Sequence, residues 1–298
     1  MEKKPLSRFS TQPVLNGEGK PVACKETPWL IRQLGVIARY PFLTAPYIAA
    51  LSGADAQSVT QSFKIAKREP NMYVRIAEFQ LRNPHLYLHS PLVYQLAHRG
   101  ESLMRKHGIE ANNDEWSGPP EHRLMSCKIR ASFDIGLKER PDISLITWST
   151  INDTGTVDPF IPTGLKNKAT GKEIRKRADC YPFIVQNGEK RYRLLGIEAD
   201  RDTESLNGKV RDAFLCYLNI LKEGTYLDHL YFDPPAYIPF VTVSQIHMRN
   251  MMQLLHAMTA ETPKLRAFFL FKVFKDEPTG WALTEPWQRV DNEPLTFV

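Results

Sequence analysis

The sequence has few cysteines and no long hydrophobic run, and these absences exclude several classes of protein. Its four cysteines, at positions 24, 127, 180 and 216, lie far apart without a C-x-x-C pair, which argues against zinc fingers and disulfide scaffolds. No apolar stretch approaches the roughly 18 to 20 residues that cross a bilayer, and no apolar segment follows the basic residues at the start. We therefore expect a cytoplasmic protein with no membrane partner.

The motifs of nucleotide-driven motors and of common hydrolases are also absent. The sequence contains no G-x-x-x-x-G-K-[ST], no G-x-G-x-x-G after a predicted strand, no H-E-x-x-H and no G-x-S-x-G. It also has no tyrosine in a three-histidine context, which argues against a relaxase that attacks DNA through a tyrosine. We expect neither a nucleotide ligand nor serine hydrolase chemistry.

The composition is that of a folded protein with an uneven distribution of charge. The chain has 298 residues, of which 42% are hydrophobic and 24% charged, enough for about two domains. Its net charge is +6, and the segment 166–177 alone holds six basic residues against one acid. The tail 276–298 has five acids against one arginine. This balance permits binding to a polyanion without requiring it.

The first half of the chain predicts a flexible leader over 1–26 and a winged helix-turn-helix domain over 27–110. Helical spacing begins at Trp29, a second short helix follows Thr44, and Asp55 is placed to cap a third. We expect two strands, over 72–76 and 85–88, and a closing helix over 91–107 that is capped by Ser90. Three helices, a two-stranded ribbon and a closing helix are the parts of a winged helix.

The third helix and the loop between the two strands carry the residues that we expect to contact DNA. Glutamine, serine and basic side chains suit base edges and phosphates, although winged helices also serve in dimerisation, in packing and as protein-binding modules. The candidates are Gln57, Ser58, Gln61, Lys64, Lys67, Arg68 and Arg82.

After a linker near 112–120, the pattern predicts a second domain over 111–275 and an acidic aromatic tail over 276–298. We expect a helix over 121–140, three strands, a helix, a strand, a helix and a last strand. The dipeptide Asn187-Gly188 indicates a hairpin between the strands 179–185 and 192–200. Packing of the tail on its own domain is favoured over docking on a partner or against the basic loop. The predicted fold class is therefore α+β with a mixed sheet in the second domain.

Three carboxylates are expected to converge on that hairpin. Asp179 lies on one strand, and Glu198 and Asp200 lie two residues apart on the other, so that they share one face. Three such groups repel one another unless they bind a divalent ion, most plausibly Mg²⁺ or Mn²⁺, which can activate water toward a phosphodiester. The alternative is that the acids pair with neighbouring arginines, namely Arg177, Arg193 and Arg201.

These residues resemble the replication-relaxation family of mobile-element proteins, which includes relaxase-like plasmid mobilisation proteins of the mobilisation protein C type. The resemblance rests on Arg177-Ala178-Asp179, the hairpin turn, the run Gly196-Ile197-Glu198-Ala199-Asp200-Arg201-Asp202-Thr203-Glu204 and His122. Further agreement between 29 and 274 includes Tyr87-Leu88, Gly100 and Arg249. The resemblance implies a winged helix joined to an α/β restriction-endonuclease-like domain of the PD-(D/E)xK nuclease type.

It also implies roles for single residues. Asp179 and Glu198 correspond to the metal-binding acids of the nuclease motif, and Asp200 stands where the motif has lysine. Asp200 adds a ligand in this interpretation, while Arg201 or Lys209 supplies the missing positive charge. Ala178 replaces the proline of the motif, and the helix before the first strand offers a further ligand or general base, Glu121 or His122.

The basic segment before Asp179 is expected to form a loop that holds DNA by its phosphates. A charged run that merely faces solvent is the alternative, and the adjacent acids favour DNA because an acidic centre needs cations to attract a polyanion. The candidates are Lys166, Lys168, Lys172, Arg175 and Lys176.

Two functions follow with nearly equal support. The first is a site-specific nickase or endonuclease of a plasmid, integrated element or phage, active in replication or conjugative mobilisation. The second is a DNA-binding regulator or scaffold whose nuclease fold is inactive, as the aspartate at position 200 suggests. A third hypothesis is a regulator that binds protein through its winged helix. Double-stranded DNA is the expected partner, with a homodimer and other mobilisation or replication proteins as further candidates.

Overall fold

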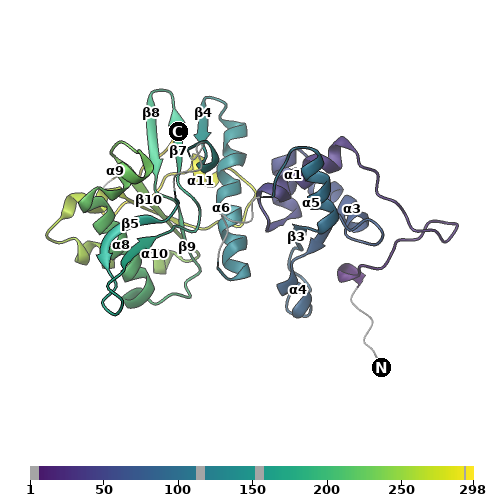
Figure 1. The fold of residues 1–298 in the computed structure, drawn as a ribbon, viewed down its shortest axis with the longest axis horizontal. Helices are drawn as coiled ribbons and strands as arrows, with labels where there is room; N and C mark the ends of the chain where they lie inside the picture. The colour runs from purple at the N-terminus through teal and green to yellow at the C-terminus, as the bar shows by residue number, and fades with distance from the viewer. Residues whose placement is uncertain (1–6, 112–117, 152–157, 292) are drawn as a thin grey trace. The chain divides into compact units, whose positions relative to one another are not determined.

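The computed structural model describes all residues except 1–6, 112–117, 152–157 and 292, and the chain divides into two compact units (Figure 1). The N-terminal unit comprises Met1–Asp114, Gly118–Ala131 and Glu277–Thr279. The C-terminal unit comprises Glu115–Ser117, Ser132–Asp276 and Gly280–Val298. Each unit mixes helices with a β-sheet, so the predicted α+β class is confirmed.

The N-terminal unit packs its helices on a small antiparallel sheet. Its sheet has the strand order β1-β3-β2, and both pairings are antiparallel. Phe63 and Tyr94 meet edge to face in the core with ring centroids 4.9 Å apart. The elements are η1 (Ser7–Phe9), α1 (Pro28–Arg39), β1 (Leu43–Thr44), α2 (Ala45–Ser52), α3 (Ala56–Ala66), β2 (Val74–Ile76), α4 (Glu78–Arg82), β3 (Val93–Leu96) and α5 (His98–Lys106).

Helix α3 begins and faces the core as the sequence predicts. The Asp55 carboxylate accepts a hydrogen bond from the backbone N–H of Ser58 at 2.8 Å, which satisfies one of the open donors at the helix start. Val59, Phe63 and Ala66 follow at helical spacing and are buried. The opposite side of α3 is therefore left facing solvent.

The segment between β2 and α5 differs from the prediction. Residues 85–88 form no strand, and the partner of β2 is β3, which occupies positions where a helix was expected. Ser90 caps no helix, because α5 begins at His98. The buried Gln80 side chain holds this segment, since it donates to the Pro91 carbonyl and accepts from the Val93 N–H.

The predicted flexible leader is held at least in part from Ser7 onward. Phe9 is 7% exposed, and the Arg8 guanidinium donates to the Leu88 carbonyl and, at 2.7 Å, to the Ser90 carbonyl. A short bridge joins Leu15 to Pro21. Arg8 and Phe9 therefore pack on the N-terminal unit, whereas most of residues 11–21 are exposed.

The C-terminal unit is built around a mixed sheet with the order β11-β10-β8-β7-β4, and β9 also pairs with β10. Strands β4, β7 and β8 are antiparallel neighbours, whereas β10 runs parallel to β8, β9 and β11. A separate hairpin consists of β5 and β6. The elements are α6 (Pro120–Glu139), β4 (Ile143–Ile146), α7 (Trp148–Ile151), β5 (Ile161–Lys166), β6 (Glu173–Lys176), β7 (Phe183–Asn187), β8 (Lys190–Leu194), β9 (Glu198–Asp200), η2 (Leu206–Val210), α8 (Arg211–Glu223), α9 (Thr225–Leu230), β10 (Ala236–Thr242), α10 (Gln245–Met258), η3 (Pro263–Phe268), β11 (Phe269–Val273) and α11 (Trp281–Thr284). The first part of α6, up to Ala131, counts with the N-terminal unit.

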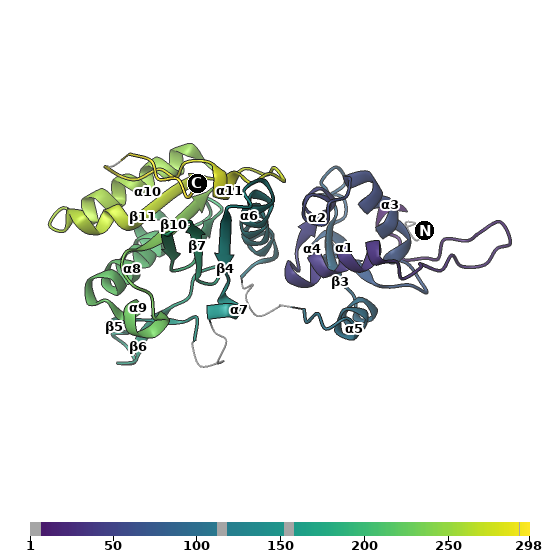
Figure 2. The same cartoon turned by 90° about the horizontal axis from the view of Figure 1, so that it is seen from above.

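Helices cover both faces of this sheet. Helices α8 and α10, labelled in Figure 2, lie on one face. They share a core in which Phe214 contacts Phe240, Phe269 and Phe271. On the other face, Phe133 of α6 contacts Phe183 of β7 with ring centroids 5.1 Å apart. Both Figures 1 and 2 show α6 beside β4.

The predicted strand over 192–200 is interrupted, and this interruption shapes the candidate site. The turn after Asn187 is confirmed, but β8 ends at Leu194 and β9 begins at Glu198. The strand predicted to begin at Asp179 begins only at Phe183. Glu198 and Asp200 therefore lie on a strand that pairs with β10 instead of the hairpin strand β7.

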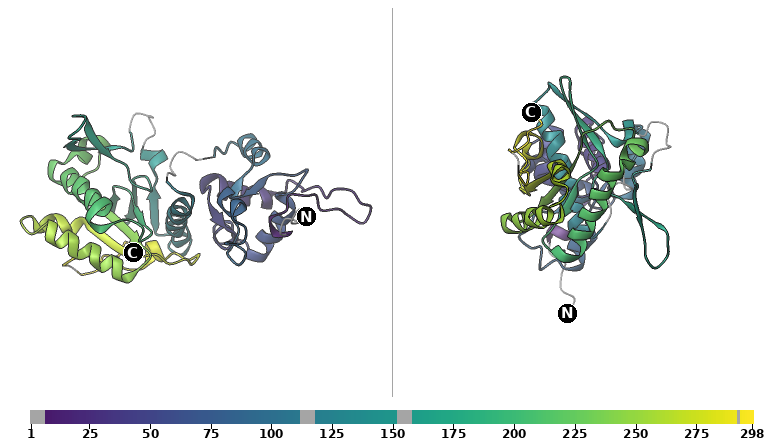
Figure 3. Two further views of the ribbon diagram at one scale, coloured as in Figure 1. Left: turned by 90° about the horizontal axis from the view of Figure 1, so that it is seen from below. Right: turned by 90° about the vertical axis from the view of Figure 1, so that its left-hand side faces the viewer.

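The basic segment is a hairpin and not the predicted loop. Lys166 ends β5, and Glu173 begins β6. The tip of this hairpin extends away from the rest of the C-terminal unit in Figure 1 and in the right-hand view of Figure 3.

From Gly280 onward the acidic tail packs on its own unit, as predicted, whereas Glu277–Thr279 count with the N-terminal unit. Trp281, Trp287 and Phe297 are each at most 1% exposed, and the Trp287 and Phe297 rings contact Phe133. Among the helices of the described residues, none is both long enough and apolar enough to cross a membrane.

Candidate functional site

A glycine between β8 and β9 allows two chain segments to approach closely. Gly196 has φ +120°, a conformation that side chains rarely adopt, and a Cβ atom there would lie 2.3 Å from the Cβ of Ala178. Residues 178–180 consequently lie against the start of β9, with Cys180 bridged to Ile197. Asp179 accepts a hydrogen bond from the Ala199 N–H at 2.8 Å through Oδ2. This contact places the Asp179 carboxylate beside β9.

Glu198 lies at the centre of a nearly buried polar cluster. Its Oε2 pairs with the Lys176 ammonium at 2.9 Å, and its Oε1 accepts the Tyr217 O–H at 2.5 Å. The side chains of Lys176 and Glu198 are only 20% and 12% exposed. We call Lys176, Asp179, Glu198 and Tyr217 the lysine–acid cluster. It joins the end of β6, the segment before β7, strand β9 and helix α8.

The charges of this cluster act strongly on one another. Burial raises the pKa of Glu198, and the nearby Asp179 raises it further, against the opposing effects of Lys176 and Tyr217. Burial alone would lower the pKa of Lys176, but the Glu198 and Asp179 carboxylates outweigh it and the pKa rises. Burial, followed by Glu198, raises the pKa of Tyr217 well above its usual value. The phenol therefore stays protonated and continues to donate to Glu198.

Asp200 belongs to a second cluster, at the end of β9. Its Oδ2 lies 2.6 Å from Nε2 of His247, in the first turn of α10, and its Oδ1 accepts the Asp202 N–H at 2.9 Å. Asp202 in turn accepts a hydrogen bond from the Thr242 hydroxyl. Burial raises the pKa of Asp200, against the lowering effect of the His247 hydrogen bond. We call Asp200, Asp202 and His247 the Asp–His cluster.

The predicted carboxylate trio is therefore divided between two clusters, and the two differ in their fit to a metal ion. Both oxygens of Glu198 are engaged, by Lys176 and Tyr217, and Asp200 pairs with His247, so the predicted ion at Asp179, Glu198 and Asp200 does not fit the arrangement of these side chains. The Asp–His cluster brings three ligand atoms within 4.8 Å of one another. Among the described residues it is the group with the donors for a cation.

The remaining predicted catalytic residues lie outside both clusters. Lys209, expected to supply positive charge, pairs with Glu204 at 3.2 Å and is 77% exposed. Arg201 follows β9 and is half-buried. Glu121 accepts a hydrogen bond from the Tyr87 hydroxyl at 3.0 Å, and both it and His122 count with the N-terminal unit. Their proposed roles stay predictions.

The predicted DNA-contacting face of α3 is exposed at four of its six positions. Gln57, Ser58, Gln61 and Lys64 face solvent. The expectation that Lys67 faces outward is wrong, because this side chain is 5% exposed and its ammonium donates to the Arg8 carbonyl. Burial, with the nearby Arg68 and Arg8 charges, lowers the Lys67 pKa to about 8.

Arg68 and Arg82 differ in exposure and setting. Arg68 is half-buried. Arg82 ends the short helix α4, is exposed and pairs with Glu78 at 2.7 Å. Exposed charge on the predicted face of α3 is therefore concentrated at Lys64.

The hairpin of β5 and β6, which we call the basic hairpin, presents three exposed lysines, Lys166, Lys168 and Lys172. Arg175 is exposed but pairs with Asp158 at 2.7 Å. Lys176, predicted to contact DNA from the surface, instead turns into the lysine–acid cluster. Alternation along β6 accounts for this difference, since neighbouring residues of a strand point to opposite sides.

Sequence reasoning missed the roles of Lys176, Tyr217, Asp202 and His247. The alternation Glu198-x-Asp200-x-Asp202 offered a signal for the third acid. His247 lies 45 residues farther along the chain than Asp202 by its number, and no local spacing links the two.

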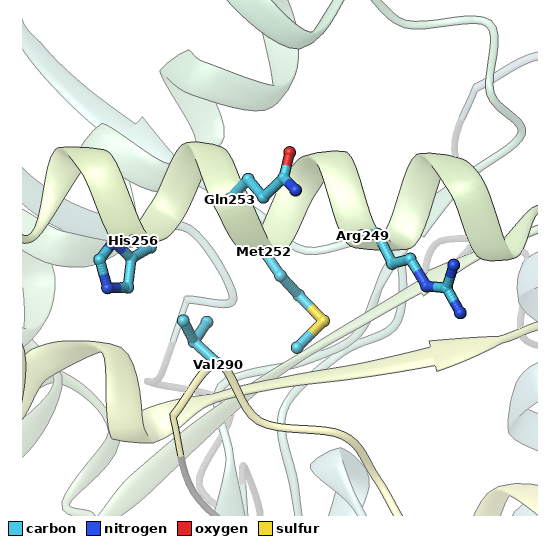
Figure 4. Close-up of a pocket in the computed structure, with 5 residues that line it drawn as sticks. All are labelled: Arg249, Met252, Gln253, His256 and Val290. Atoms are coloured by element: carbon cyan, nitrogen blue, oxygen red, sulfur yellow. The ribbon is translucent and has the colours of Figure 1, made fainter.

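A separate cavity of about 390 Å³ lies along the exposed side of α10. Figure 4 shows Met252 and Val290 pointing toward each other across it, whereas Gln253 points away. Arg249 and His256 complete the lining. This lining holds none of the residues of the two clusters.

Comparisons with protein-family models, with curated proteins and with solved structures found no match to this chain.

Proposed function

We propose that the protein binds double-stranded DNA of a mobile element and hydrolyses a phosphodiester bond at the lysine–acid cluster. The observation that carries the proposal is the position of Lys176. In the resemblance to PD-(D/E)xK nucleases, the lysine of the motif has no counterpart, because Asp200 stands at its position. Lys176, on β6, lies 2.9 Å from Glu198 and acts electrostatically on Asp179 as well. Two acids and one lysine, the residue types of the motif, thus come together from the stretch 176–179 and from strand β9.

The order of elements in the C-terminal unit supports the nuclease-like fold. Helix α6 precedes three antiparallel strands, β4, β7 and β8, and helix α8 then leads to the parallel strand β10. Asp179 precedes the second of these strands, and Glu198 follows the third.

The N-terminal unit supports specific DNA binding. Its order of three helices with a three-stranded antiparallel sheet agrees with a winged helix. The side chains of Gln57, Gln61 and Lys64 project from the exposed face of α3. In this proposal the amides contact base edges and the lysine contacts a phosphate.

The chemistry follows from the contacts of the cluster. The Lys176 ammonium, held by Glu198, stabilises the negative charge that develops on the scissile phosphate. Asp179 accepts a proton of the attacking water as the water oxygen bonds to phosphorus, and Tyr217 keeps Glu198 in position. The bond from phosphorus to the leaving sugar oxygen breaks, and that oxygen takes a proton from solvent. A Mg²⁺ or Mn²⁺ ion, when bound, would supply further charge neutralisation. On this chain Asp200 would hold it, with Asp202 and His247.

The test is nicking of supercoiled plasmid from the protein's own element, with Mg²⁺, Mn²⁺ or EDTA. We expect relaxed circles with the unaltered chain. The nicking rate should fall at least about 100-fold in Lys176→Met, Asp179→Asn and Glu198→Gln. Lys264→Met is the control, because it removes an exposed lysine of η3 that lies outside the cluster and outside the lysines expected to contact DNA. Nicking that survives Lys176→Met at full rate would overturn the proposed centre.

The second candidate is a DNA-binding regulator or scaffold without catalysis. The engagement of both Glu198 oxygens favours it, since a structural ion pair has this form as well. Sequence-specific DNA binding with no cleavage under any metal would establish this candidate. Loss of binding in Gln61→Ala together with Lys64→Ala would then assign recognition to α3.

A further inference from the structure

We propose that Asp200, Asp202 and His247 form a binding site for a divalent transition-metal ion, separate from the lysine–acid cluster. The inference deepens the proposed function, since this site would hold the ion of the proposed cleavage. A chain that bound the ion without cutting DNA would refute the cleavage and leave the site standing. It also differs from the metal site that the sequence predicted, which used Asp179 and Glu198 together with Asp200, so that only Asp200 is common to both.

Three elements bring the donor atoms together. Asp200 ends β9, Asp202 lies two residues beyond it, and His247 projects from the first turn of α10. Their ligand atoms all lie within 4.8 Å of one another. The Asp200 and His247 side chains are 6% and 12% exposed, so both groups are largely buried. Burying polar groups costs free energy, which a bound cation would offset.

The positions of these groups are fixed by their neighbours. The Ser244 side chain caps α10 by accepting the His247 N–H at 3.0 Å, which anchors the backbone that carries the imidazole. Thr242, at the end of β10, donates to Asp202. Outer partners of this kind orient metal ligands in proteins. Strands β9 and β10 are parallel and end here together, the edge of a sheet at which α/β proteins bind ligands.

The donor set indicates the class of metal. Two carboxylates suit Mg²⁺, Ca²⁺ and Mn²⁺, whereas an imidazole suits Zn, Cu, Fe and Ni. Mn²⁺ is the first ion to test, because it is a transition-metal ion that carboxylates suit. Zn²⁺ is the second ion to test, because it takes nitrogen and carboxylate ligands in catalytic sites.

The competing interpretation is a simple His–Asp pair that stabilises the fold. Electron paramagnetic resonance of the full chain titrated with Mn²⁺ distinguishes the two. We expect one bound ion per chain and, in the pulsed experiment, modulation from one directly bound imidazole nitrogen. A structural His–Asp pair gives neither signal.

Variants locate the site. His247→Ala and Asp202→Asn are expected to weaken Mn²⁺ binding at least about tenfold, since even outer-shell losses cost about 10- to 100-fold, and His247→Ala abolishes the nitrogen modulation. His256→Ala, an exposed histidine on the same helix, is the matched control and leaves both signals intact. A second variant, His247→Gln, and circular dichroism of every variant show whether a loss of Mn²⁺ binding comes from unfolding.

Other outcomes overturn the proposal. If Glu198→Gln and Asp179→Asn abolish Mn²⁺ binding while folded His247→Ala retains it, the ion belongs to the lysine–acid cluster. If the unaltered chain binds neither Mn²⁺ nor Zn²⁺, the Asp–His cluster is a structural pair. Plasmid nicking is scored separately, so its absence does not affect either conclusion.

Discussion

Lys272 is a buried cation that neither cluster uses. It lies on β11, 6% exposed, and its ammonium donates to the carbonyls of Trp281 and Glu285 at 2.8 and 2.7 Å. The Trp287 ring centroid is 4.6 Å from Nζ. Burial lowers the pKa of Lys272 to about 7, although the Glu285 carboxylate opposes this shift. An uncharged amine can still donate both hydrogen bonds.

This shift predicts how stability depends on pH. Between about pH 7 and the usual lysine pKa of about 10.4, the unfolded chain keeps a proton that the folded chain has released. The free energy of unfolding therefore rises with pH in this window. The gain is at least about 1 kcal/mol, since one pKa unit corresponds to about 1.4 kcal/mol. Urea unfolding of the unaltered chain and of Lys272→Met at pH 7 and pH 9.5 measures it.

We expect the unaltered chain to gain stability relative to Lys272→Met as the pH rises. Lys264→Met, which alters an exposed lysine, provides the reference and should show no such difference. A gap between the unaltered chain and Lys272→Met that stays constant or narrows with rising pH would contradict the assignment.

The segment after β11 closes one face of the C-terminal sheet. The Trp287 backbone pairs with Leu295, and its indole N–H donates to the Ala282 carbonyl at 2.9 Å. The Ala282 N–H in turn donates to the Ser132 hydroxyl on α6. The aromatic residues of this tail, and not its acidic composition, indicate that it packs on the C-terminal unit.

Truncation of this anchor should destabilise the protein strongly. Trp287 is fully buried, and we expect Trp287→Ala to lower the free energy of unfolding by about 3–5 kcal/mol, the usual cost of removing a large buried ring. Trp29→Ala removes a tryptophan that is 37% exposed and should cost much less. Chemical denaturation followed by circular dichroism compares the two. Equal losses would mean that the tail does not anchor the core.

Local signals predicted the elements whose determinants lie within a few residues of one another. Asp55 as an N-cap and Asn187-Gly188 as a turn are of this kind, and both are confirmed. The strand expected over 85–88 failed because its apolar pattern has no buried partner, and Leu86 is 76% exposed. Alternation alone does not fix a strand without a neighbour to pair with.

The site was predictable only in part, because its partners come from distant positions. Asp179 and Glu198 were found through the motif, but Lys176 reaches Glu198 only because β6 folds back toward β9. His247 contacts Asp200 because the short connection after β10 places the start of α10 beside the end of β9. Such contacts depend on topology, which residue spacing does not record.

At the level of the whole chain, exposed lysines that are expected to contact DNA occur on both units. The exposed lysine of α3 lies on the N-terminal unit, and those of the β5–β6 hairpin lie on the C-terminal unit. Binding to phosphates releases counterions, so the logarithm of the affinity falls linearly with that of the salt concentration, with a slope of about −0.9 per phosphate contact.

If both surfaces contact DNA, each lysine removed should lower the magnitude of that slope by about 0.9. Fluorescence anisotropy with a labelled duplex, over a series of salt concentrations, measures the slope for Lys64→Ala and for Lys172→Ala. Lys264→Ala, an exposed lysine on η3 outside both surfaces, is the control and should leave the slope unchanged. A slope reduced by Lys64→Ala alone would confine DNA to the α3 surface. A slope that neither variant changes would mean that the chain does not hold DNA by these lysines, and the proposed cleavage would then lose the contacts that bring its substrate to Lys176.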